Sequence, residues 1–440
     1  MYKRYDKYKD SGVEWIGEVP EHWLLIRLKN AVELVTRKST KDDSNKPYIG
    51  LEHVQSWIGK LIYADDESNN DNGPSEELAN TFKPGQVLFG KLRPYLAKGF
   101  LANIHGRCSS ELLVLEPEKV IPSYLLYIVL TEGFIETVNS STYGAKMPRA
   151  SWSFIGNMDI PQPTYENQKA ISNYLDHKTS EIDFLIADKD ELIKKLEEYK
   201  QSIITEAVTK GLNPDVKMKD SGIEWIGEVP EHWEISKVKY HSNINQKTLT
   251  DKTPDDYEIN YLDISNVDSN GKILNIEPMV FKDAPSRARR IVSEGDTLVS
   301  TVRTYLRAIT WFDSVKTNLV CSTGFAVLNP KESVEPKYLS FLMKSTLYVE
   351  EIVSRSVGVS YPAITASEIA DLDLLLPPIS EQKVIVDYID DIVKNLENII
   401  ADTNCQIQNL KKYRQSLIYE AATGKIDVRE YEPERSEQLA

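Results

Sequence analysis

The sequence predicts a mixed α+β fold of the α/β class that is built twice, as two globular domains that are each followed by a long helix. The chain has 440 residues, which is more than one compact core usually supports. The segment KDSGVEWIGEVPEHW at residues 9–23 returns as KDSGIEWIGEVPEHW at residues 219–233. Residues 167–208 and 381–422 contain neither proline nor glycine, as is typical of helices. Together these features predict an internal pseudo-two-fold repeat.

The repeat continues beyond the opening segment. GQVLFGKLRPYL at residues 85–96 aligns with GDTLVSTVRTYL at residues 295–306, again 210 positions apart. From Tyr124 and Tyr338 onward the separation is 214, because the second copy carries four additional residues. Within each globule we expect short strands, as at residues 86–92 and 111–115, and a helical stretch from residue 123 to about 138.

These boundaries divide the chain into five parts. The predicted limits are residues 1–163 for the first globular domain, 164–211 for a first helical spacer, 212–377 for the second globular domain, 378–426 for a second helical spacer, and 427–440 for an acidic C-terminal tail. The two spacers should be helical throughout, or broken near Asp176 and His177 in the first and near Asp390 and Asp391 in the second.

Both helical stretches show an apolar stripe at heptad spacing. Alternate steps of three and four residues give Ile182, Leu185, Lys189, Leu192, Leu196, Tyr199, Ile203 and Glu206, and, 214 positions later, Leu396, Ile399, Thr403, Gln406, Leu410, Tyr413, Leu417 and Glu420. The stripes predict that the two helices pack as an antiparallel coiled coil. The alternative is that each helix packs only on its own globule.

Composition excludes several classes of protein. With 41% hydrophobic and 27% charged residues, the chain is typical of a globular protein, and it has no apolar run long enough to span a membrane. The N-terminus lacks the apolar core of a secretory signal, so we expect a cytoplasmic location and no membrane partner. The three cysteines are widely spaced and are expected to be reduced.

Charge is segregated along the chain. The formal net charge is −15, which argues against a uniformly basic surface. Residues 81–110 nevertheless contain five basic and no acidic side chains, and residues 282–307 contain six basic side chains against three acidic ones. Acidic residues are concentrated elsewhere, as at residues 65–77. A polyanion site on an acidic protein is therefore compatible with the sequence.

The motifs of common catalytic sites are missing from the sequence. There is no GxxxxGK[ST] phosphate loop, no HExxH or paired Cys/His metal set, and no GxSxG elbow. His22 and His232 recur in the opening segment, where a copied structural residue is favoured over an acid/base pair. A duplicated enzyme should repeat its reactive residues, and few charged residues recur.

The best shared polar pair is an arginine with a tyrosine. Arg93 and Tyr95 of the first copy correspond to Arg303 and Tyr305 of the second. Arginine beside an aromatic ring suits contact with phosphate or bases. The alternative is that the arginine ends a strand and the tyrosine packs.

The pattern of likeness and divergence points to two different ligands and one repeated partner. The opening segment and the helices are alike in the two copies, whereas residues 24–85 and 234–295 have diverged. We therefore expect two copies of one partner protein on a pseudo-symmetric scaffold, and two DNA half-sites at a fixed separation.

These residues resemble the specificity subunits of type I restriction-modification systems. The resemblance rests on the duplicated opening segment, the RxYL block, and the proline-marked exit followed by EQKVIVDYID and a long helix; it covers nearly the whole chain. The first copy departs from it with TYENQKA where the second has PISEQKV, and the tail after Asp427 is a further departure.

The resemblance implies a non-catalytic subunit with two target-recognition domains. Each domain would recognise one half of a bipartite target in double-stranded DNA, and the antiparallel helices would set the spacer. Two methyltransferase subunits and then restriction-translocase subunits would bind the chain. S-adenosylmethionine, ATP and magnesium would belong to those partners, and this chain would bind no cofactor and no metal.

Candidate DNA-binding residues follow from charge and position. They are Lys91, Arg93, Tyr95, Lys98, Arg107, Lys146 and Arg149 in the first globule and Arg287, Arg289, Arg290, Arg303, Tyr305, Arg307 and Tyr361 in the second. The four residues shared by both copies cannot distinguish two different half-sites, and suit phosphate contact or the fold itself. Two other functions remain: a coiled-coil scaffold that joins two identical proteins without recognising DNA, and a stand-alone duplicated nuclease or methyltransferase.

Overall fold

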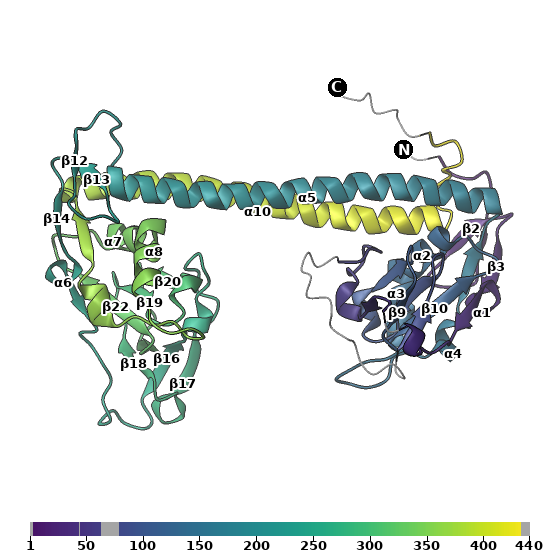
Figure 1. Cartoon of the computed structure of the whole chain (residues 1–440), viewed down its shortest axis with the longest axis horizontal. Helices are drawn as coiled ribbons and strands as arrows, with labels where there is room; N and C mark the ends of the chain where they lie inside the picture. Colours follow the sequence, from purple (N-terminus) through teal and green to yellow (C-terminus); the bar gives the residue numbers. More distant parts are fainter. Residues whose placement is uncertain (1–2, 44, 63–78, 433–440) are drawn as a thin grey trace. The chain divides into compact units, whose positions relative to one another are not determined.

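The computed structural model describes residues 3–43, 45–62 and 79–432, and the chain divides into two compact units. Unit 1 comprises Met1–Lys189 and Cys405–Ala440, and unit 2 comprises Asp190–Asn404. Each unit contains one globule and a part of both long helices (Figure 1). The acidic segment 65–77 and the end of the C-terminal tail, 433–440, lie outside the described residues.

The repeated opening segment forms the same hairpin in both units. Strand β1 (Tyr8–Asp10) pairs antiparallel with β2 (Glu18–Pro20), and β12 (Met218–Asp220) pairs with β13 (Glu228–Pro230) in the same register. Each hairpin ends next to a tryptophan, Trp23 or Trp233, that is fully buried. The segment is therefore a structural entry to each globule.

Each globule is built on a four-stranded sheet. In unit 1 the strand order is β4 (Val32–Val35), β10 (Leu112–Pro117), β7 (Val87–Gly90) and β8 (Gly99–Leu101). In unit 2 it is β15 (Ser242–Ile244), β22 (Phe325–Pro330), β19 (Thr297–Ser300) and β20 (Ile309–Trp311). The mixed α+β fold is therefore confirmed, and the predicted strands at 86–92 and 111–115 correspond to β7 and β10.

Two helices pack against this sheet and its turns in each unit. They are α2 (Pro122–Val129) and α3 (Glu132–Ser140) in unit 1, and α7 (Pro336–Lys344) and α8 (Thr346–Arg355) in unit 2. The prediction of one helical stretch from 123 to about 138 is wrong in one respect. Thr131 is extended, with ψ of 143°, and its hydroxyl donates to the Ile128 carbonyl, so the chain breaks between α2 and α3.

The diverged segments contribute most strands of a second sheet beside the first. In unit 1 it contains β5 (Tyr48–Ile49), β9 (Gly106–Cys108) and β6 (Asn80–Phe82). In unit 2 it contains β17 (Glu277–Val280), β16 (Glu258–Leu262), β21 (Leu319–Ser322) and β18 (Ala288–Ile291). The pairing of β5 with β9 and of β16 with β21 is parallel, so the corresponding strands keep the same pairing in the region where the sequences of the two copies differ.

Short elements close each globule. The exit strand pairs with the entry strand: β11 (Asp159–Gln162) with β3 (Leu24–Arg27), and β23 (Asp373–Leu376) with β14 (Glu234–Lys237). The remaining short helices are α1 (Leu28–Ala31), α4 (Trp152–Ile155), α6 (Val238–His241) and α9 (Ala366–Ala370).

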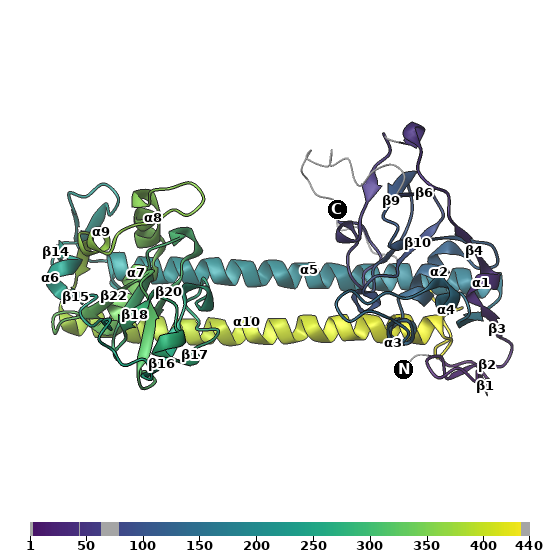
Figure 2. The ribbon, with the colours of Figure 1, turned by 90° about the horizontal axis from the view of Figure 1, so that it is seen from below.

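The two long helices are continuous. Helix α5 spans Tyr165–Lys210 and α10 spans Ile379–Ala422, so neither breaks near Asp176 or Asp390, where the sequence allows a break (Figure 2). In unit 1, Lys189 Nζ donates to Gln406 Oε1 at 2.6 Å, and Asp183 contacts Arg414. In unit 2, Lys200 contacts Glu397. In unit 1 the pairing order reverses along the two helices, so they run antiparallel there.

The seam between the helices differs from the predicted stripe at every second position. Ile182, Leu396, Thr403 and Leu417 are buried as predicted, but Leu185, Leu192, Tyr199, Ile399 and Tyr413 are 44–57% exposed. The neighbouring residues fill the seam instead, among them Lys200, Ile407, Arg414 and Ala421, which are at most 6% exposed. At every second position of the predicted stripe, the residue next to the predicted one is therefore the one that lies in the seam. At Lys200 and Arg414 the seam accepts a cation because each has a carboxylate partner on the opposite helix.

Equivalent hydrogen bonds anchor each globule to a helix end. Tyr124 Oη donates to the Ala422 carbonyl at 2.9 Å in unit 1, and Tyr338 Oη donates to the Val208 carbonyl at 3.2 Å in unit 2. The amide of Gln168 likewise accepts from the backbone of Ile121, and that of Gln382 from Glu335. These contacts use residues that lie 214 positions apart, so both globules are attached in the same way.

The C-terminal residues lie against the N-terminal hairpin in unit 1. The amide of Asp427 donates to the Lys3 carbonyl at 2.8 Å, and Lys3 Nζ pairs with Glu430 at 2.8 Å. Further along, Tyr431 packs edge-on against Tyr174, with 4.7 Å between ring centroids, and its hydroxyl lies 2.8 Å from His177 Nδ1. The described part of the tail is thus ordered on unit 1.

Candidate nucleic-acid interface

An arginine in a left-handed backbone conformation follows the same strand in both units. Arg93, after β7, has φ of 49°, and Arg303, after β19, has φ of 50°. A short 3-10 turn follows each, and the turn ends in a second left-handed residue, Ala97 or Arg307. Such a conformation costs a residue other than glycine about 1 kcal/mol. Its duplication indicates that the loop shape itself is retained.

A second loop packs beside each of these turns. The amide of Arg93 donates to the Pro148 carbonyl, and that of Arg303 to the Pro362 carbonyl, each at 2.7 Å. We call residues 93–97 and 143–149 the recognition loops of unit 1, and residues 303–307 and 357–363 the recognition loops of unit 2. The two pairs have equivalent backbones, yet the second loop of each pair reads YGAKMPR in unit 1 and VGVSYPA in unit 2.

The tips of the recognition loops combine exposed aromatic and basic side chains. Tyr95 is 47% exposed and Tyr305 is 53% exposed. The Arg303 guanidinium lies 4.5 Å from the centroid of the Tyr361 ring, which is 65% exposed. Stacking of this kind holds the guanidinium plane while its N–H groups stay available to phosphate or to a base edge. The arrangement suits a nucleic acid better than a small molecule.

The structure brings eight of the fourteen predicted site residues together on these loops. They are Arg93, Tyr95, Lys146 and Arg149 in unit 1 and Arg303, Tyr305, Arg307 and Tyr361 in unit 2. Arg149 is held by Glu111, with its Nη2 3.0 Å from Oε1, and this pairing raises its pKa. Arg307 Nη2 lies 3.5 Å from the Thr346 hydroxyl.

The other predicted residues of unit 1 lie away from the loop tips. Arg107 is 6% exposed, and its Nε donates to the Lys46 carbonyl at 3.2 Å. Lys98 Nζ donates to the Leu51 carbonyl at 2.7 Å, so it ties the loop to the diverged segment. Lys91 is partly exposed and lies two residues before the first loop. Arg107 and Lys98 are thus held by backbone carbonyls in this structure.

In unit 2 three predicted arginines lie on or beside β18 of the second sheet. Arg287 pairs with Asp263 at 3.1 Å, and Arg289 pairs with Asp251 at 3.3 Å. Arg290 is half-buried, burial lowers its pKa, and its Nη1 has no hydrogen-bond partner among the described residues. Arg287 is exposed, and Arg289 is partly exposed, whereas Arg290 faces the interior beside Cys321.

Sequence reasoning missed the exposed apolar residues of the second loops. Tyr143 and Met147 in unit 1 and Val357 and Val359 in unit 2 are all more than half exposed. A glycine with positive φ, Gly144 or Gly358, lies among them. Apolar residues around a glycine are the available signal, and selection by charge and position does not use it.

The requirements of a metal site and of a membrane-spanning helix can be compared with the described residues. Within residues 3–43, 45–62 and 79–432, no group of three or more His, Cys, Asp or Glu side chains is placed to hold a metal ion. None of the helices described in the structure is both long and apolar enough to pass through a bilayer.

Comparison with known proteins agrees with this architecture. Residues 230–409 match the family model of the type I restriction modification DNA specificity domain. The chain is 23% identical to the MjaVIII type I restriction enzyme specificity subunit of Methanocaldococcus jannaschii, over 93% of this chain and 94% of that one.

Two solved structures have a similar fold. One, from a study of complex assembly and conformational transition of the type I R-M system, has a TM-score of 0.70 at 20% identity, and covers 93% of this chain and 99% of that one. The other is the HsdS subunit of Thermoanaerobacter tengcongensis, with a TM-score of 0.50 at 20% identity, over 93% of this chain and 98% of that one.

The duplicated globules and the two long helices define the class as a two-domain DNA-recognition subunit. The chain carries the type I restriction modification DNA specificity domain at residues 230–409 and is similar over 93% of its length to a type I specificity subunit. It is accordingly the non-catalytic, DNA-recognising member of such a system.

Proposed function

We propose that each unit recognises one half of a bipartite target in double-stranded DNA through its recognition loops. The observation that carries the proposal is the equivalence of the loop backbones, strained at the same positions, combined with different side chains at the tips. Arg93 and Arg303 are shared and would position phosphates. Lys146, Met147 and Arg149 differ from Ser360, Tyr361 and Ala363 and would contribute to sequence preference, together with the diverged segments.

The domain limits follow from this assignment. Residues 1–163 and 212–377 would be the target-recognition domains, and residues 164–211 and 378–426 the helical spacers that set the distance between half-sites. The other predicted contacts, Lys91, Lys98 and Arg107 in unit 1 and Arg287, Arg289 and Arg290 in unit 2, would support the loops or extend the basic surface.

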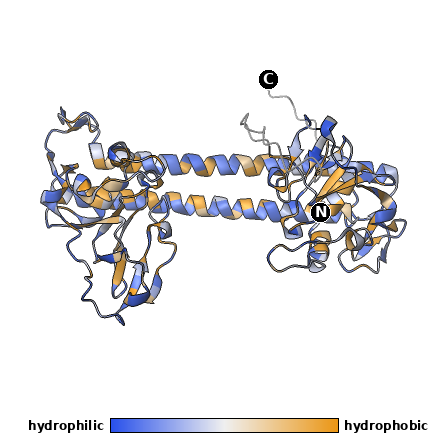
Figure 3. Cartoon of the chain, turned by 60° about the horizontal axis from the view of Figure 1, so that its bottom comes forward, coloured by the Kyte–Doolittle hydropathy of each residue, from blue (hydrophilic) through white to orange (hydrophobic). Residues whose placement is uncertain are grey.

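The exposed residues that were predicted to fill the seam support a repeated protein partner. Unit 1 presents Leu185 from α5 and Tyr413 from α10, and unit 2 presents Ile399 and Tyr199 at the equivalent positions. Each of the four is 45–57% exposed. In Figure 3, hydrophobic and hydrophilic residues alternate along the ribbons of both helices. Tyrosine and branched aliphatic residues are suitable anchors for a protein interface.

The partner would be a DNA methyltransferase subunit, with one copy on each unit. Restriction-translocase subunits would join the resulting complex. S-adenosylmethionine, ATP and magnesium would bind to those partners and not to this chain. Since the complex acts on DNA, the proposed location is cytoplasmic.

Methylation mapping tests the proposal. The chain would be co-expressed with its methyltransferase subunit, and methylated bases would be mapped across the host genome. A single split motif with a fixed spacer is expected. Scattered or absent methylation from a well-formed complex would sink the proposal. A scaffold that does not recognise DNA would leave no footprint on DNA even with its partners bound.

Exchange of one diverged segment separates the two recognition units. Replacing residues 24–85 by the corresponding segment of a related chain should change one half of the motif and leave the other half and the spacer as they were. A change in both halves would contradict the assignment of one half-site to each unit.

A further inference from the structure

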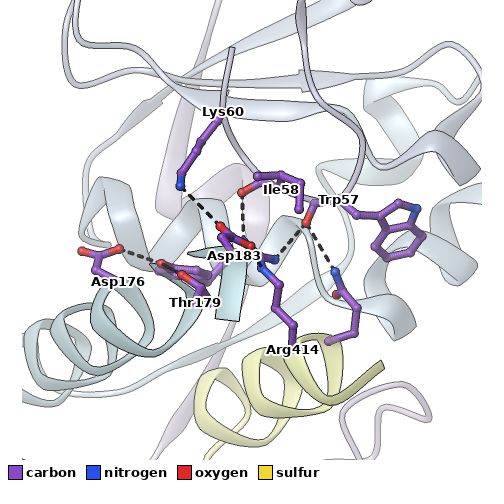
Figure 4. A network of polar contacts seen from close by, with 9 residues as sticks. Trp57, Ile58, Lys60, Asp176, Thr179, Asp183 and Arg414 are labelled. Atoms are coloured by element: carbon purple, nitrogen blue, oxygen red, sulfur yellow. Dashed lines mark hydrogen bonds and ion pairs between the residues drawn. The ribbon is translucent and has the colours of Figure 1, made fainter. Parts of the chain in front are cut away.

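A buried arginine on α10 connects the helical seam of unit 1 to the globule. Arg414 is 3% exposed. Its Nε lies 2.8 Å from Asp183 Oδ1 on α5. The other end of the guanidinium donates to two backbone carbonyls of the diverged segment, from Nη1 to Trp57 at 3.0 Å and from Nη2 to Ile58 at 3.2 Å (Figure 4). One rigid side chain thus binds both helices and the globule.

Neighbouring residues complete this contact. Gln415 Nε2 also donates to the Trp57 carbonyl, at 3.3 Å. Lys60 Nζ reaches from the globule to Asp183 Oδ2 at 3.3 Å. We call the set Trp57, Ile58, Lys60, Asp183 and Arg414 the seam clamp. Its buried charges are mutually paired, which is the condition for a buried ion pair to persist.

The seam clamp leads directly to a recognition loop. Trp57 has φ of 66°, an unusual conformation for a bulky residue, and its amide donates to the Ala97 carbonyl at 3.0 Å. Ala97 ends the turn that contains Arg93 and Tyr95. Two hydrogen bonds therefore join the Arg414 side chain to the loop that carries the proposed phosphate contact. The backbone of Trp57 is strained where it makes both bonds, which indicates that the contact determines its conformation.

Unit 2 does not repeat this contact. The residue equivalent to Arg414 is Lys200, 214 positions earlier, and the residue equivalent to Asp183 is Glu397. Lys200 Nζ lies 3.8 Å from Glu397 Oε1. In the described part of unit 2 Lys200 donates no hydrogen bond to the backbone of the diverged segment. The seam charge is conserved between the units, but its bond to the globule is specific to unit 1.

We propose that Arg414 is a positioning residue that fixes the recognition loops of unit 1 relative to the helical seam, and so determines which spacers between the half-sites are accepted. The inference rests on the proposed function. One added base pair moves a half-site by about 3.4 Å and turns it by about 36°. A loop held by the seam clamp would not follow that change, whereas a released loop could.

The test compares duplexes of different spacer length. The complex of the full chain with its methyltransferase subunits would be titrated with DNA carrying the mapped motif at its native spacer, one base pair longer and one base pair shorter. In Arg414→Met, Asp183 keeps Lys60 and the Trp57 carbonyl keeps Gln415. We expect the ratio of the Kd values for altered and native spacers to fall about tenfold, equivalent to about 1.4 kcal/mol. Discrimination between correct and altered bases in the half-sites should be unchanged.

A matched control and a second variant keep the outcome clear. Lys200→Met removes the equivalent seam charge in unit 2 and should leave the spacer ratio as in the unsubstituted chain. Arg414→Lys keeps a cation beside Asp183 but cannot bond both carbonyls in the same geometry, so its ratio should lie between those of the methionine variant and the unsubstituted chain. If Arg414→Met does not fold, the test is made with Arg414→Lys instead.

The two proposals fail in different ways. An unchanged spacer ratio in folded Arg414 variants, including a uniform loss of affinity for all three duplexes, overturns the positioning role. An equal fall of the spacer ratio in Lys200→Met and Arg414→Met would also overturn the positioning role, because the fall would then result from loss of a seam charge and not from loss of the bonds to the globule. A failure of the unsubstituted chain to specify a split motif would instead refute the proposed function.

Discussion

The two units share a backbone design and differ in the polar contacts that support it. Tyr124 and Tyr338, and Gln168 and Gln382, make the same hydrogen bonds in both. Three equivalent positions differ: Arg414 against Lys200 in the seam, Asn167 against Glu381 at the start of the long helix, and Leu130 against Lys344 at the end of the first covering helix. The globules are therefore attached to the helices by the same contacts in both units, whereas other polar contacts of each globule differ.

The entry hairpins illustrate this difference. In unit 2, Trp233 Nε1 donates to Glu381 Oε1 at 3.1 Å, and His232 Nε2 lies 2.7 Å from the other carboxylate oxygen. In unit 1, Trp23 is equally buried but its Nε1 has no hydrogen-bond partner among the described residues, because Asn167 replaces the glutamate. The sequence departure TYENQKA therefore removes an anchor that the second copy retains.

The largest expected effect concerns the symmetry of partner binding. Tyr413→Ala in unit 1 and Tyr199→Ala in unit 2 should each weaken the binding of one methyltransferase subunit by about 2–3 kcal/mol, as is usual for an aromatic anchor at an interface. Native mass spectrometry should then show complexes with one methyltransferase subunit in either single variant and none in the double variant. Loss of both subunits in a single variant would contradict two independent sites. Tyr165→Ala, at another exposed tyrosine of α5, is the control and should leave the stoichiometry unchanged.

The next effect concerns the recognition loops. Arg93→Ala and Arg303→Ala should each reduce DNA affinity by about 1–3 kcal/mol and lower the salt dependence of binding, because each would remove a phosphate contact. Titrations at several salt concentrations measure both quantities. The control is Arg27→Ala, at an exposed arginine of β3 outside the recognition loops. Equal loss of affinity at every salt concentration would show that these arginines do not bind phosphate.

A smaller effect concerns the entry hairpins. Glu381→Ala should destabilise the hairpin of unit 2 by about 1–2 kcal/mol, because it leaves the buried Trp233 N–H without an acceptor. Asn167→Glu should stabilise the hairpin of unit 1 by supplying the acceptor that Trp23 lacks. Hydrogen exchange of the β12–β13 and β1–β2 peptides measures the two effects separately. If Glu381→Ala accelerates exchange in both hairpins, the contact is not local to unit 2.

Much of the fold could be predicted from the sequence because the chain repeats itself. The opening segment at 9–23 and 219–233 located both globules, and the lack of proline and glycine located α5 and α10. The seam could be located only at alternate positions. Leu185 and Ile186 are both apolar, as are Leu192 and Ile193, so periodicity allows either register. Only Tyr199 against Lys200 distinguished them, and hydrophobicity favoured the wrong residue.

The site could be predicted in part. The shared Arg93 and Arg303 were found because duplication retains them, and the structure places them at equivalent strained turns. Arg107 and Arg290 were selected by charge, but the former is bound to a backbone carbonyl and the latter is half-buried. The role of Arg414 could not be foreseen, because its partners Asp183, Trp57 and Ile58 are far from it in sequence and approach only through tertiary packing.

The smallest expected effect concerns Lys344, at the position that Leu130 fills in unit 1. Burial, with smaller contributions from Lys200 and Lys337, lowers the pKa of Lys344 from 10.5 to about 8. The unfolded chain would keep this proton up to about pH 10.5, whereas the folded unit releases it near pH 8. The free energy of unfolding should therefore rise with pH between these two values.

Lys344→Leu should stabilise unit 2 by about 1 kcal/mol at pH 7, because it removes the cost of burying the charge. Denaturant titrations from pH 7 to 10 should show that the advantage of the variant shrinks as pH rises, whereas Lys252→Leu at an exposed lysine should show no such trend. An advantage of Lys344→Leu that stays constant across this range would mean that packing, and not the buried charge, distinguishes the two units here.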